Sequence, residues 1–284
     1  VEPGPTANFS ATTVCHGDTT VFTDQSTGTS GAIITWAWDM GGAGAYVGPT
    51  SSSSEDPIFI YTNAGIYNVT LTVTDDNGCI GDTTIIVTVD TLPIANFSAT
   101  EICHGDTTVF TDQSTGTSGT IITWSWDMGG VGAYVSPTSS SSPDPIFIYT
   151  NAGTYNVTLT VTDDNGCIHD TTIVVIVRPN PTANFSATTI CEGDTTLFTD
   201  LSTTISPLGG SIITWSWDMG GAGSYVSPTT SISEDPVFVY SNDGTYNVTL
   251  TVTDDNGCMH DTTIVVTVEP GPTANFSATT VCHG

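Results

Sequence analysis

The chain has almost no positive charge. One Lys or Arg stands against 29 Asp and Glu, so the formal net charge is −28. Nucleic acids and anionic membrane surfaces are bound through Lys and Arg, and both partner classes are therefore excluded. Long apolar runs are also absent, because no stretch of about 18 apolar residues is present to cross a bilayer. Hydrophobic residues still form 38% of the chain, which is enough to build packed cores.

Catalytic motifs are missing as well. The sequence has no nucleophile elbow, phosphate-binding glycine loop or HExxH motif. The histidines fall into two sets, one directly after a cysteine and one two residues after a cysteine: His16, His104 and His283, and His169 and His260. A later copy of the repeat has Glu192 in the first position, and the first copy has Gly81 in the second. Catalytic groups would not change in this way between near-identical copies, so we expect no enzyme activity.

An internal repeat dominates what is present. The segment PTANFSATTVCHGDTT begins at Pro5, and close variants of it begin at Pro93, Pro181 and Pro272. The offsets are 88, 88 and 91 residues, and the last is longer because residues 206–210 expand a loop. Each unit has the size of one small sandwich domain. The expected domains are residues 1–90, 91–178 and 179–269, followed by the first strand of a truncated fourth repeat at 270–284.

A second regularity concerns the two ends of the sequence. Residues 1–17 are identical to residues 268–284, including details that differ among the three copies. This identity predicts a window from a longer periodic array. The alternative is a four-domain stretch with a chance match at a linker. The chain starts at Val1 without a Met or a signal-peptide pattern, which favours a fragment or a mature segment.

Short strand patterns at regular spacing predict an all-β fold. Apolar residues alternate with polar ones at Tyr67, Val69, Leu71 and Val73, and again at Ile34, Trp36, Trp38 and Met40. A period of two places each apolar set on one face of a strand. Thr20 and Phe22 are likewise expected to point inward. Asn77-Gly78 predicts a tight hairpin turn with positive φ at both residues.

The repeated motifs resemble a known family. Trp-x-Trp-Asp-Met-Gly-Gly, followed by Gly-x-Tyr-Asn-Val-Thr-Leu-Thr-Val-Thr-Asp-x-Asn-Gly, is similar to the PKD (polycystic kidney disease) domain. The resemblance implies tandem immunoglobulin-like β-sandwiches that are extracellular and serve as spacer, adhesive or binding modules without catalysis. The Trp-Asp-Phe-Gly-Asp-Gly stretch of the family is altered here. Met replaces Phe and Gly replaces the second Asp, at Met40, Met128 and Met219 and at Gly42, Gly130 and Gly221. The loss of that carboxylate weakens any ligand role it had.

Six cysteines are expected to form one disulfide inside each domain. The pairs are Cys15 with Cys79, Cys103 with Cys167, and Cys191 with Cys258, at separations of 64, 64 and 67 residues. Closing such a loop should stabilise a domain by about 4 kcal/mol in the chain-entropy model. The alternative is a reduced buried pair. Metal binding is poorly supported, because no second Cys or His pair lies at metal-ligand spacing. Cys282 is left over. Oxidised cysteines indicate an extracellular or cell-surface location.

Two kinds of glycan acceptor are predicted. Asp-Thr-Thr resembles the O-glycosylation acceptor of Bacteroidota, which fits a secreted surface or fibre protein of that group. The candidates are Thr19, Thr83, Thr107, Thr171, Thr195 and Thr262. The alternative is that Asp-Thr-Thr is only the polar first part of a strand in a Thr-rich protein. Asn-x-Ser/Thr sequons occur at Asn8, Asn68, Asn96, Asn156, Asn184, Asn247 and Asn275.

Acidic pairs at the hairpin ends are candidates for Ca²⁺. Asp75 and Asp76 form the first pair, and Asp163-Asp164 and Asp254-Asp255 repeat it. Carboxylate oxygens are the ligands that Ca²⁺ prefers, but no EF-hand loop matches. The alternative is a solvated acidic face that keeps the protein soluble. No other cofactor is expected.

The favoured function is structural: a non-catalytic repeat protein of an extracellular fibre, filament or stalk. Its partners would be further copies of itself, by self-association or by covalent continuation of the chain, and glycans. The alternative is a cell-surface adhesin or a spacer that binds carbohydrate or protein. Tyr46, Tyr134 and Tyr225 are the best candidates for sugar-stacking platforms, although packing at a sheet edge is the favoured explanation for them. The sequence leaves open whether one long chain or docked subunits form the fibre.

Overall fold

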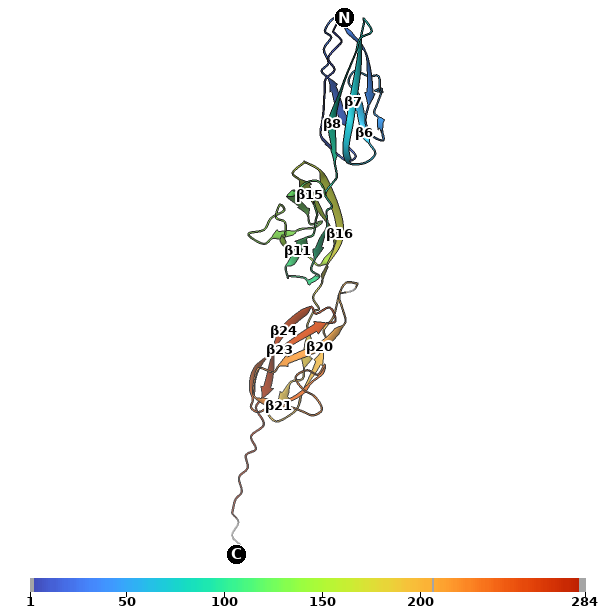
Figure 1. The fold of residues 1–284 in the computed structure, drawn as a ribbon. Helices are drawn as coiled ribbons and strands as arrows, with labels where there is room; N and C mark the ends of the chain where they lie inside the picture. The colour runs from blue at the N-terminus through green and yellow to red at the C-terminus, as the bar shows by residue number, and fades with distance from the viewer. Residues whose placement is uncertain (1–2, 206, 281–284) are drawn as a thin grey trace.

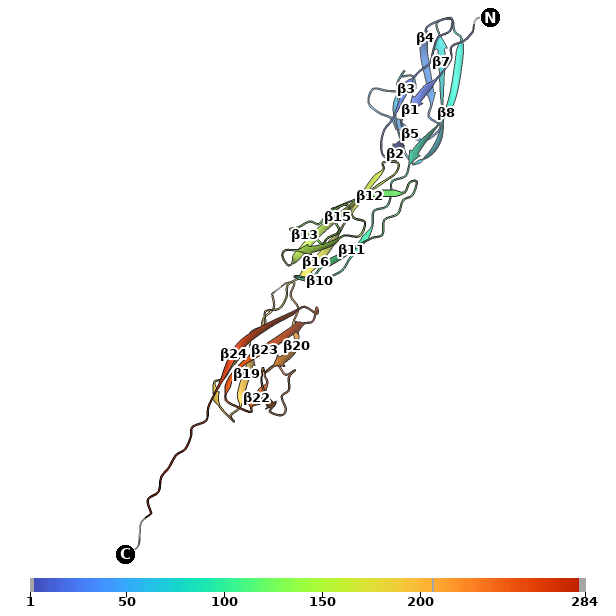
Figure 2. The ribbon, with the colours of Figure 1, turned by 90° about the vertical axis from the view of Figure 1, so that its left-hand side faces the viewer.

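The computed structural model describes residues 3–205 and 207–280. Within them the chain forms strands and no helix, arranged as three β-sandwiches that follow one another end to end (Figure 1). A second view, turned by 90°, shows the same extended arrangement (Figure 2). The all-β class of tandem immunoglobulin-like sandwiches is therefore confirmed.

The first sandwich consists of two four-stranded sheets. One has the order β1 (Phe9–Ala11), β3 (Thr20–Asp24), β6 (Ile58–Tyr61) and β5 (Gly44–Tyr46). The other has the order β2 (Val14–Cys15), β8 (Ile80–Asp90), β7 (Gly65–Asp75) and β4 (Ile33–Asp39). Neighbouring strands are antiparallel except β2 and β8, which run parallel.

The second and third sandwiches repeat this topology. In the second sandwich, one sheet has the order β9 (Phe97–Ala99), β11 (Thr108–Asp112), β14 (Ile146–Tyr149) and β13 (Gly132–Tyr134). The other sheet has the order β10 (Ile102–Cys103), β16 (Ile168–Arg178), β15 (Gly153–Asp163) and β12 (Ile121–Asp127). In the third sandwich, one sheet has the order β17 (Phe185–Ala187), β19 (Thr196–Asp200), β22 (Val237–Tyr240) and β21 (Gly223–Tyr225). The other sheet has the order β18 (Ile190–Cys191), β24 (Met259–Glu269), β23 (Gly244–Asp254) and β20 (Ile212–Asp218).

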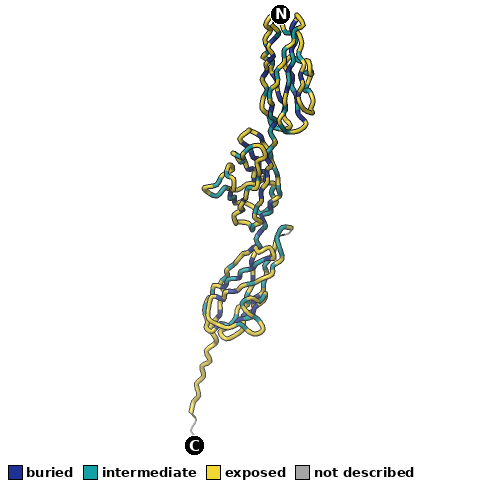
Figure 3. The backbone as a smooth tube through the Cα atoms, viewed as in Figure 1, coloured by how far each residue is buried: buried dark blue, intermediate teal, exposed yellow. Residues whose placement is uncertain are grey.

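Each sandwich has a hydrophobic core of its own. In the first, the Trp38 ring packs edge-on against Phe9 at a centroid distance of 4.9 Å and lies 5.4 Å from Phe22. The same cluster recurs in the other two copies. Figure 3 shows buried positions along the inside of each sandwich and exposed positions on its outer faces. Val69 and Leu71 are fully buried, as the two-residue period predicts. Each unit can therefore pack without its neighbours.

One strand differs from the predicted alternation. Ile34 was expected inside, but it is 56% exposed, and Ile33 packs against the core instead. A β-bulge explains the change, because the pairing of β4 with β7 shifts between Ile33 and Thr35. A bulge inserts one unpaired residue and reverses the phase of the strand before it. Trp38 and Met40, beyond the bulge, are buried as expected.

The Asn-Gly hairpin is present with a different turn. β7 and β8 are joined there, but Gly78 has a φ of 80° and no residue other than glycine has positive φ in the described chain. Asp75 pairs with Cys79 through its N–H, at 3.0 Å, and accepts a hydrogen bond from the Gly78 N–H, also at 3.0 Å. This is a three-residue loop that ends in a left-handed glycine, so positive φ is needed only at Gly78.

Candidate functional site: the disulfide-bridged junctions

In each sandwich, two neighbouring parallel strands end side by side at the same end of that sandwich. In the first sandwich Cys15 in β2 lies opposite Asp90 in β8, and the N–H of His16 donates to the Asp90 carbonyl at 2.7 Å. The chain continues from Asp90 through Thr91 into the second sandwich. Cys15 therefore lies at the junction between the first and second sandwiches.

The other cysteine lies at the opposite end of the sandwich. Cys79 follows the β7–β8 hairpin loop, and the Asp75 Oδ1 atom fixes it by accepting its N–H at 2.8 Å and that of Asn77 at 3.0 Å. From there β8 runs for 11 residues to Asp90, beside Cys15. A strand of that length spans roughly 33 Å. A disulfide needs Cα atoms within about 7 Å, so Cys15 and Cys79 cannot pair inside one sandwich.

The disulfides instead join neighbouring sandwiches. Cys15 bonds to Cys167 and Cys103 bonds to Cys258, each with a Cα–Cα distance of 5.5 Å. In both cases the cysteine at the exit of one sandwich meets the hairpin cysteine of the next. The predicted pairing of Cys15 with Cys79, Cys103 with Cys167, and Cys191 with Cys258 is wrong. Cys79 and Cys191 are free, and Cys282 lies outside the described residues.

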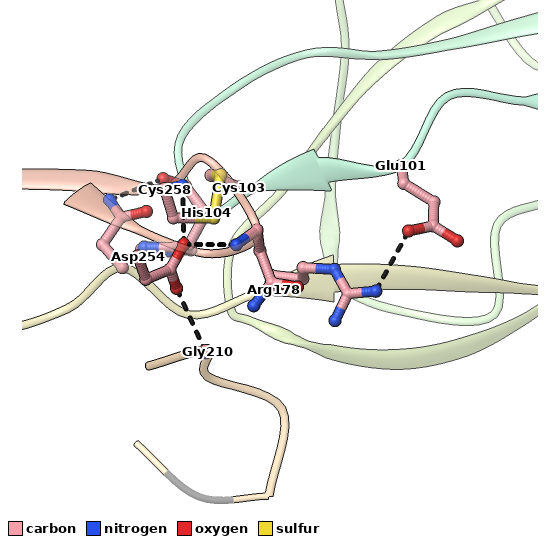
Figure 4. Close-up of a disulfide and its surroundings, with 9 residues drawn as sticks. Glu101, Cys103, His104, Arg178, Gly210, Asp254 and Cys258 are labelled. Carbon is pink, nitrogen blue, oxygen red and sulfur yellow. Dashed lines mark hydrogen bonds and ion pairs between the residues drawn. A yellow bond between two sulfur atoms is a disulfide. The ribbon is translucent and has the colours of Figure 1, made fainter. Parts of the chain in front are cut away.

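Figure 4 shows the second junction. Cys103 and Cys258 meet beside Arg178, the last residue of β16, whose guanidinium lies 3.1 Å from the Glu101 carboxylate. This ion pair is at the surface and contributes little stability. The Asp254 carboxylate accepts the N–H of Gly210 at 3.1 Å. Gly210 belongs to the lengthened loop of the third copy, which therefore lies next to the hairpin that carries the disulfide.

Each junction has two covalent connections. One is the peptide linker, Thr91-Leu92-Pro93 or Pro179-Asn180-Pro181, and the other is the disulfide. Proline fixes φ and stiffens the linker. At the second junction the Asn180 side chain also donates to the His104 carbonyl at 3.1 Å. A single linker would allow the sandwiches to swivel, whereas two connections side by side oppose both rotation and bending.

The histidines support the backbone at both ends of the sandwiches. The Nε2 atoms of His16 and His104 lie 3.1 and 3.0 Å from the carbonyls of Thr62 and Thr150. The Nδ1 atoms of His169 and His260 accept the N–H groups of Ala95 and Ala183 at 3.1 and 3.0 Å. These partners are all backbone groups of the same sandwich. In the described part of the chain, no three His, Cys, Asp or Glu residues gather as metal ligands would.

The O-glycosylation candidates fall into two structural classes. Thr19, Thr107 and Thr195 are exposed, and each precedes a buried Thr at the start of a strand. Thr20 and Phe22 point inward as predicted. The second class lies within the long β8-type strands and is only half-exposed: Thr83, Thr171 and Thr262. The candidate asparagines are all exposed: Asn8, Asn68, Asn96, Asn156, Asn184, Asn247 and Asn275. Glycosylation of either kind stays a prediction.

The acidic pair at the hairpin divides into two roles. Asp75 is fully buried and holds the loop through its Oδ1 atom, while its Oδ2 atom has no hydrogen-bond partner. Asp76 is exposed. The carboxylate of Asp75 thus has a structural role that the sequence pattern does not indicate. Binding of Ca²⁺ by Asp75 and Asp76 stays a prediction.

The tyrosines considered as stacking platforms pack against the protein. The Tyr46 ring meets Phe59 edge-on at 5.0 Å and is only partly exposed, and Tyr134 and Tyr225 repeat this contact. Burial raises the pKa of Tyr46, and the nearby Asp39 carboxylate raises this pKa further. The arrangement matches packing at a sheet edge.

Each of the three repeats matches a known domain family. The model of the PKD domain family matches residues 2–89, 90–177 and 178–268. The pre-pro-metalloprotease PrtV of Vibrio cholerae is 33% identical over 160 residues, which are 55% of this chain and 16% of PrtV. The crystal structure of the PKD1 domain of Vibrio anguillarum Epp is 34% identical, with a TM-score of 0.27, over 32% of this chain and 99% of that domain. The PKD1 domain of PrtV itself is 31% identical, with a TM-score of 0.25, over 30% of this chain and 96% of that domain.

In the described residues there is no helix long and apolar enough to cross a membrane.

Proposed function

Because the chain belongs to the PKD domain family, whose members are non-catalytic and typically extracellular modules, we propose that it is a structural element of an extracellular fibre, filament or stalk. Tandem repeats of this kind suggest a structural or adhesive module, and the junctions favour the structural role. Its partners are further copies of the same repeat, arranged end to end.

The doubly connected junction carries this proposal. Cys15–Cys167 and Cys103–Cys258 each add a covalent bond beside a linker of three residues. A module that only presents a binding face needs no such bond between its neighbours. A rod that must keep its direction over many repeats does, because each free joint would add bending.

The composition supports the same role. A net charge of −28 keeps long polymers apart in solution, and Arg178 is the only site for proteases that cut after basic residues. Each sandwich also contacts mainly its neighbours in sequence, which is the organisation of a linear array.

Small-angle X-ray scattering of the purified chain tests the proposal. The oxidised chain should have the maximum dimension of a straight rod of three sandwiches. The double variant Cys15→Ser/Cys167→Ser removes one disulfide and should give a broader distribution of bent shapes. Cys79→Ser is the matched control, because Cys79 is free and its loss should leave the rod unchanged.

Negative-stain electron microscopy of the native material provides the second readout. Unbranched fibres of sandwich width are the expected result. Compact particles, or an oxidised chain as flexible as the Cys15→Ser/Cys167→Ser variant, would contradict a structural role for the junctions.

A further inference from the structure

The β5–β6 loop divides the first sandwich into two halves of chain, and each other sandwich has an equivalent loop. In the first sandwich it comprises residues 47–57, and its counterparts are residues 135–145 and 226–236. Residues 51–53 are exposed in it, and Glu55 is an exposed acidic residue. Exposed loops are the preferred sites of proteolytic nicking. A protease would therefore cut each sandwich here, between its first five strands and its last three.

The two halves of a sandwich interlock in both sheets. In the first sandwich β3 pairs with β6 in one sheet, and β4 pairs with β7 in the other. Phe22 and Trp38 from the first half share one core with Leu71 from the second. The Tyr61 hydroxyl of the second half also donates to the Met40 carbonyl of the first at 3.0 Å. A cut in the loop therefore leaves the two halves packed against each other.

Each disulfide spans parts of two sandwiches. Cys15–Cys167 encloses the loops of the first and second sandwiches and the linker between them. Cys103–Cys258 encloses the loops of the second and third sandwiches and their linker. Every peptide bond between Cys15 and Cys258 is therefore bridged by at least one disulfide, and the bonds between Cys103 and Cys167 are bridged by both.

We propose that the crossed disulfides make the chain tolerant of proteolysis. A cut in the loop of any one sandwich, or of any two, leaves all fragments joined by disulfides. Hydrolysis adds one water to each broken peptide bond and does not change the sulfur bridges. Cuts in all three loops leave two covalent strands, each of which supplies one half of every sandwich, and the packed cores hold these strands together. This inference depends on the cysteine pairing and not on the proposed fibre.

Engineered cleavage sites test the proposal. The recognition sequence of a site-specific protease is inserted after Ser53, Ser141 or Ile232, which are exposed and occupy equivalent positions in the three loops. Variants carry one, two or three of these sites. The remaining thiols are alkylated before cleavage, so that no disulfide rearranges. Intact masses are then measured under denaturing conditions, first without and then with a reductant.

One or two cuts should leave a single covalent species that separates into fragments only after reduction. Three cuts should give two species made of alternate fragments: residues 1–53 with 142–232, and residues 54–141 with 233–284. A single species after three cuts would indicate bridges inside the sandwiches, such as Cys15 with Cys79, and would overturn the proposal. Release of a fragment after one or two cuts, without reduction, would overturn it as well.

Serine variants provide the matched control. With a single cut in the first loop, Cys15→Ser/Cys167→Ser should release the N-terminal fragment without reduction, because the other disulfide does not span that loop. Cys103→Ser/Cys258→Ser with the same cut should remain in one piece, because Cys15–Cys167 is intact. Equal release from the two variants would contradict the assigned spans.

The unmodified chain gives a test that no insertion disturbs. Glu55 and Glu234 are exposed in the first and third loops, whereas Pro143 stands at this position in the second. Brief digestion with a Glu-specific protease should give molecules cut at one or both of these residues, as peptide mapping after reduction identifies. Without reduction such molecules should keep the whole chain and gain the mass of one water per cut. Loss of residues 1–55 or 235–284 from them would refute the tolerance.

The packing of the cut sandwiches is tested without denaturant. The triply cut chain should elute as one particle, and its maximum dimension in X-ray scattering should equal that of the uncut chain. Separation of the two strands in native buffer would show that the cores do not hold them together, and would overturn that part of the proposal.

Discussion

Cys15 and Asp90 lie opposite each other in two parallel strands that leave the first sandwich together. From this position one strand continues by a peptide bond and the other by a disulfide to Cys167. The pairing of β2 with β8 therefore determines that the cysteine joins two sandwiches and does not close a loop inside one.

Hydrogen exchange should distinguish the sandwiches by their number of bridges. When one sandwich unfolds between folded neighbours, each disulfide lowers the conformational entropy of the unfolded chain. For a loop of this size, this raises the free energy of unfolding by about 4 kcal/mol. The second sandwich has two bridges and the first has one. Amides of β15 should therefore exchange roughly tenfold or more slowly than those of β7 in the oxidised chain.

The chain provides its own control for this comparison. Strands β7 and β15 differ only by Ile66 and Thr154, so their amides have nearly the same intrinsic rates. After reduction of both disulfides the two strands should exchange at similar rates. Equal protection before reduction would show that the bridges do not confine the unfolded state.

Alkaline pH should destabilise every sandwich. Burial raises the pKa values of Tyr61, Tyr149 and Tyr240 far above that of a free tyrosine. The unfolded chain loses these protons above about pH 10 while the folded chain retains them, so the free energy of unfolding is constant below that pH and falls above it. Denaturant titrations at about pH 8 and about pH 11 measure the difference.

Tyr61→Phe separates this effect from general alkaline damage. The Tyr61 hydroxyl donates to the Met40 carbonyl at 3.0 Å, so the variant should lose about 1–2 kcal/mol at neutral pH. Its further loss at alkaline pH should be smaller than that of the unchanged chain. Tyr67→Phe removes an exposed hydrogen bond to Asn63 and should keep most of the alkaline loss, because burial is the largest cause of the raised pKa of Tyr61 and the neighbouring Tyr67 only adds to it.

The β-bulge makes opposite predictions for two adjacent isoleucines. Ile33 packs against the core, so Ile33→Ala should lower the stability of the first sandwich by about 1–2 kcal/mol. Ile34 is 56% exposed, so Ile34→Ala should change stability by less than about 0.5 kcal/mol. Thermal unfolding of the two variants checks this order, and the reverse order would place the bulge elsewhere.

Glycan occupancy should follow exposure if Asp-Thr-Thr is an acceptor. The exposed set of Thr19, Thr107 and Thr195 should be modified before the half-exposed set of Thr83, Thr171 and Thr262. A transferase must reach the hydroxyl, and in the second set that hydroxyl lies within a paired strand of the sheet. Mass spectrometry of glycopeptides measures occupancy, and preferential modification of the second set would contradict this order.

The sequence was sufficient to predict the sandwich but not its cysteine pairing. Val69 and Leu71 are fully buried because strand alternation is a local property that the sequence displays directly. The cysteine pairing depends on the direction of the strands, which decides the end of the sandwich at which each cysteine lies. A separation of 64 residues does not reveal that Cys15 lies at the exit of the sandwich and Cys79 at its entrance. Only the parallel pairing of Cys15 with Asp90, an 11-residue strand away from Cys79, fixes that.

Ile34 and Asp75 were missed for related reasons. A bulge shifts the phase of a strand without any special residue at the shift, so Ile33 and Ile34 look equivalent in sequence. Asp75 was considered as a metal ligand because acidic pairs are common in both solvated turns and Ca²⁺ sites. Its role in the loop depends on the direction of one carboxylate oxygen toward the N–H groups of Asn77 and Cys79.

The crossed disulfides also determine how the rod carries load. One covalent line runs down β2 to Cys15, across to Cys167, along β16 and on to Cys191, while a second runs along β8 to Cys103, across to Cys258 and along β24. The two lines lie side by side where β2, β10 and β18 pair with their parallel partners. Most of the core residues of each sandwich belong to the segment of chain that connects one line to the other. If tension is applied through both lines, the segment that carries most of each core is not stretched, so we expect the chain to extend little before the strands on these lines separate.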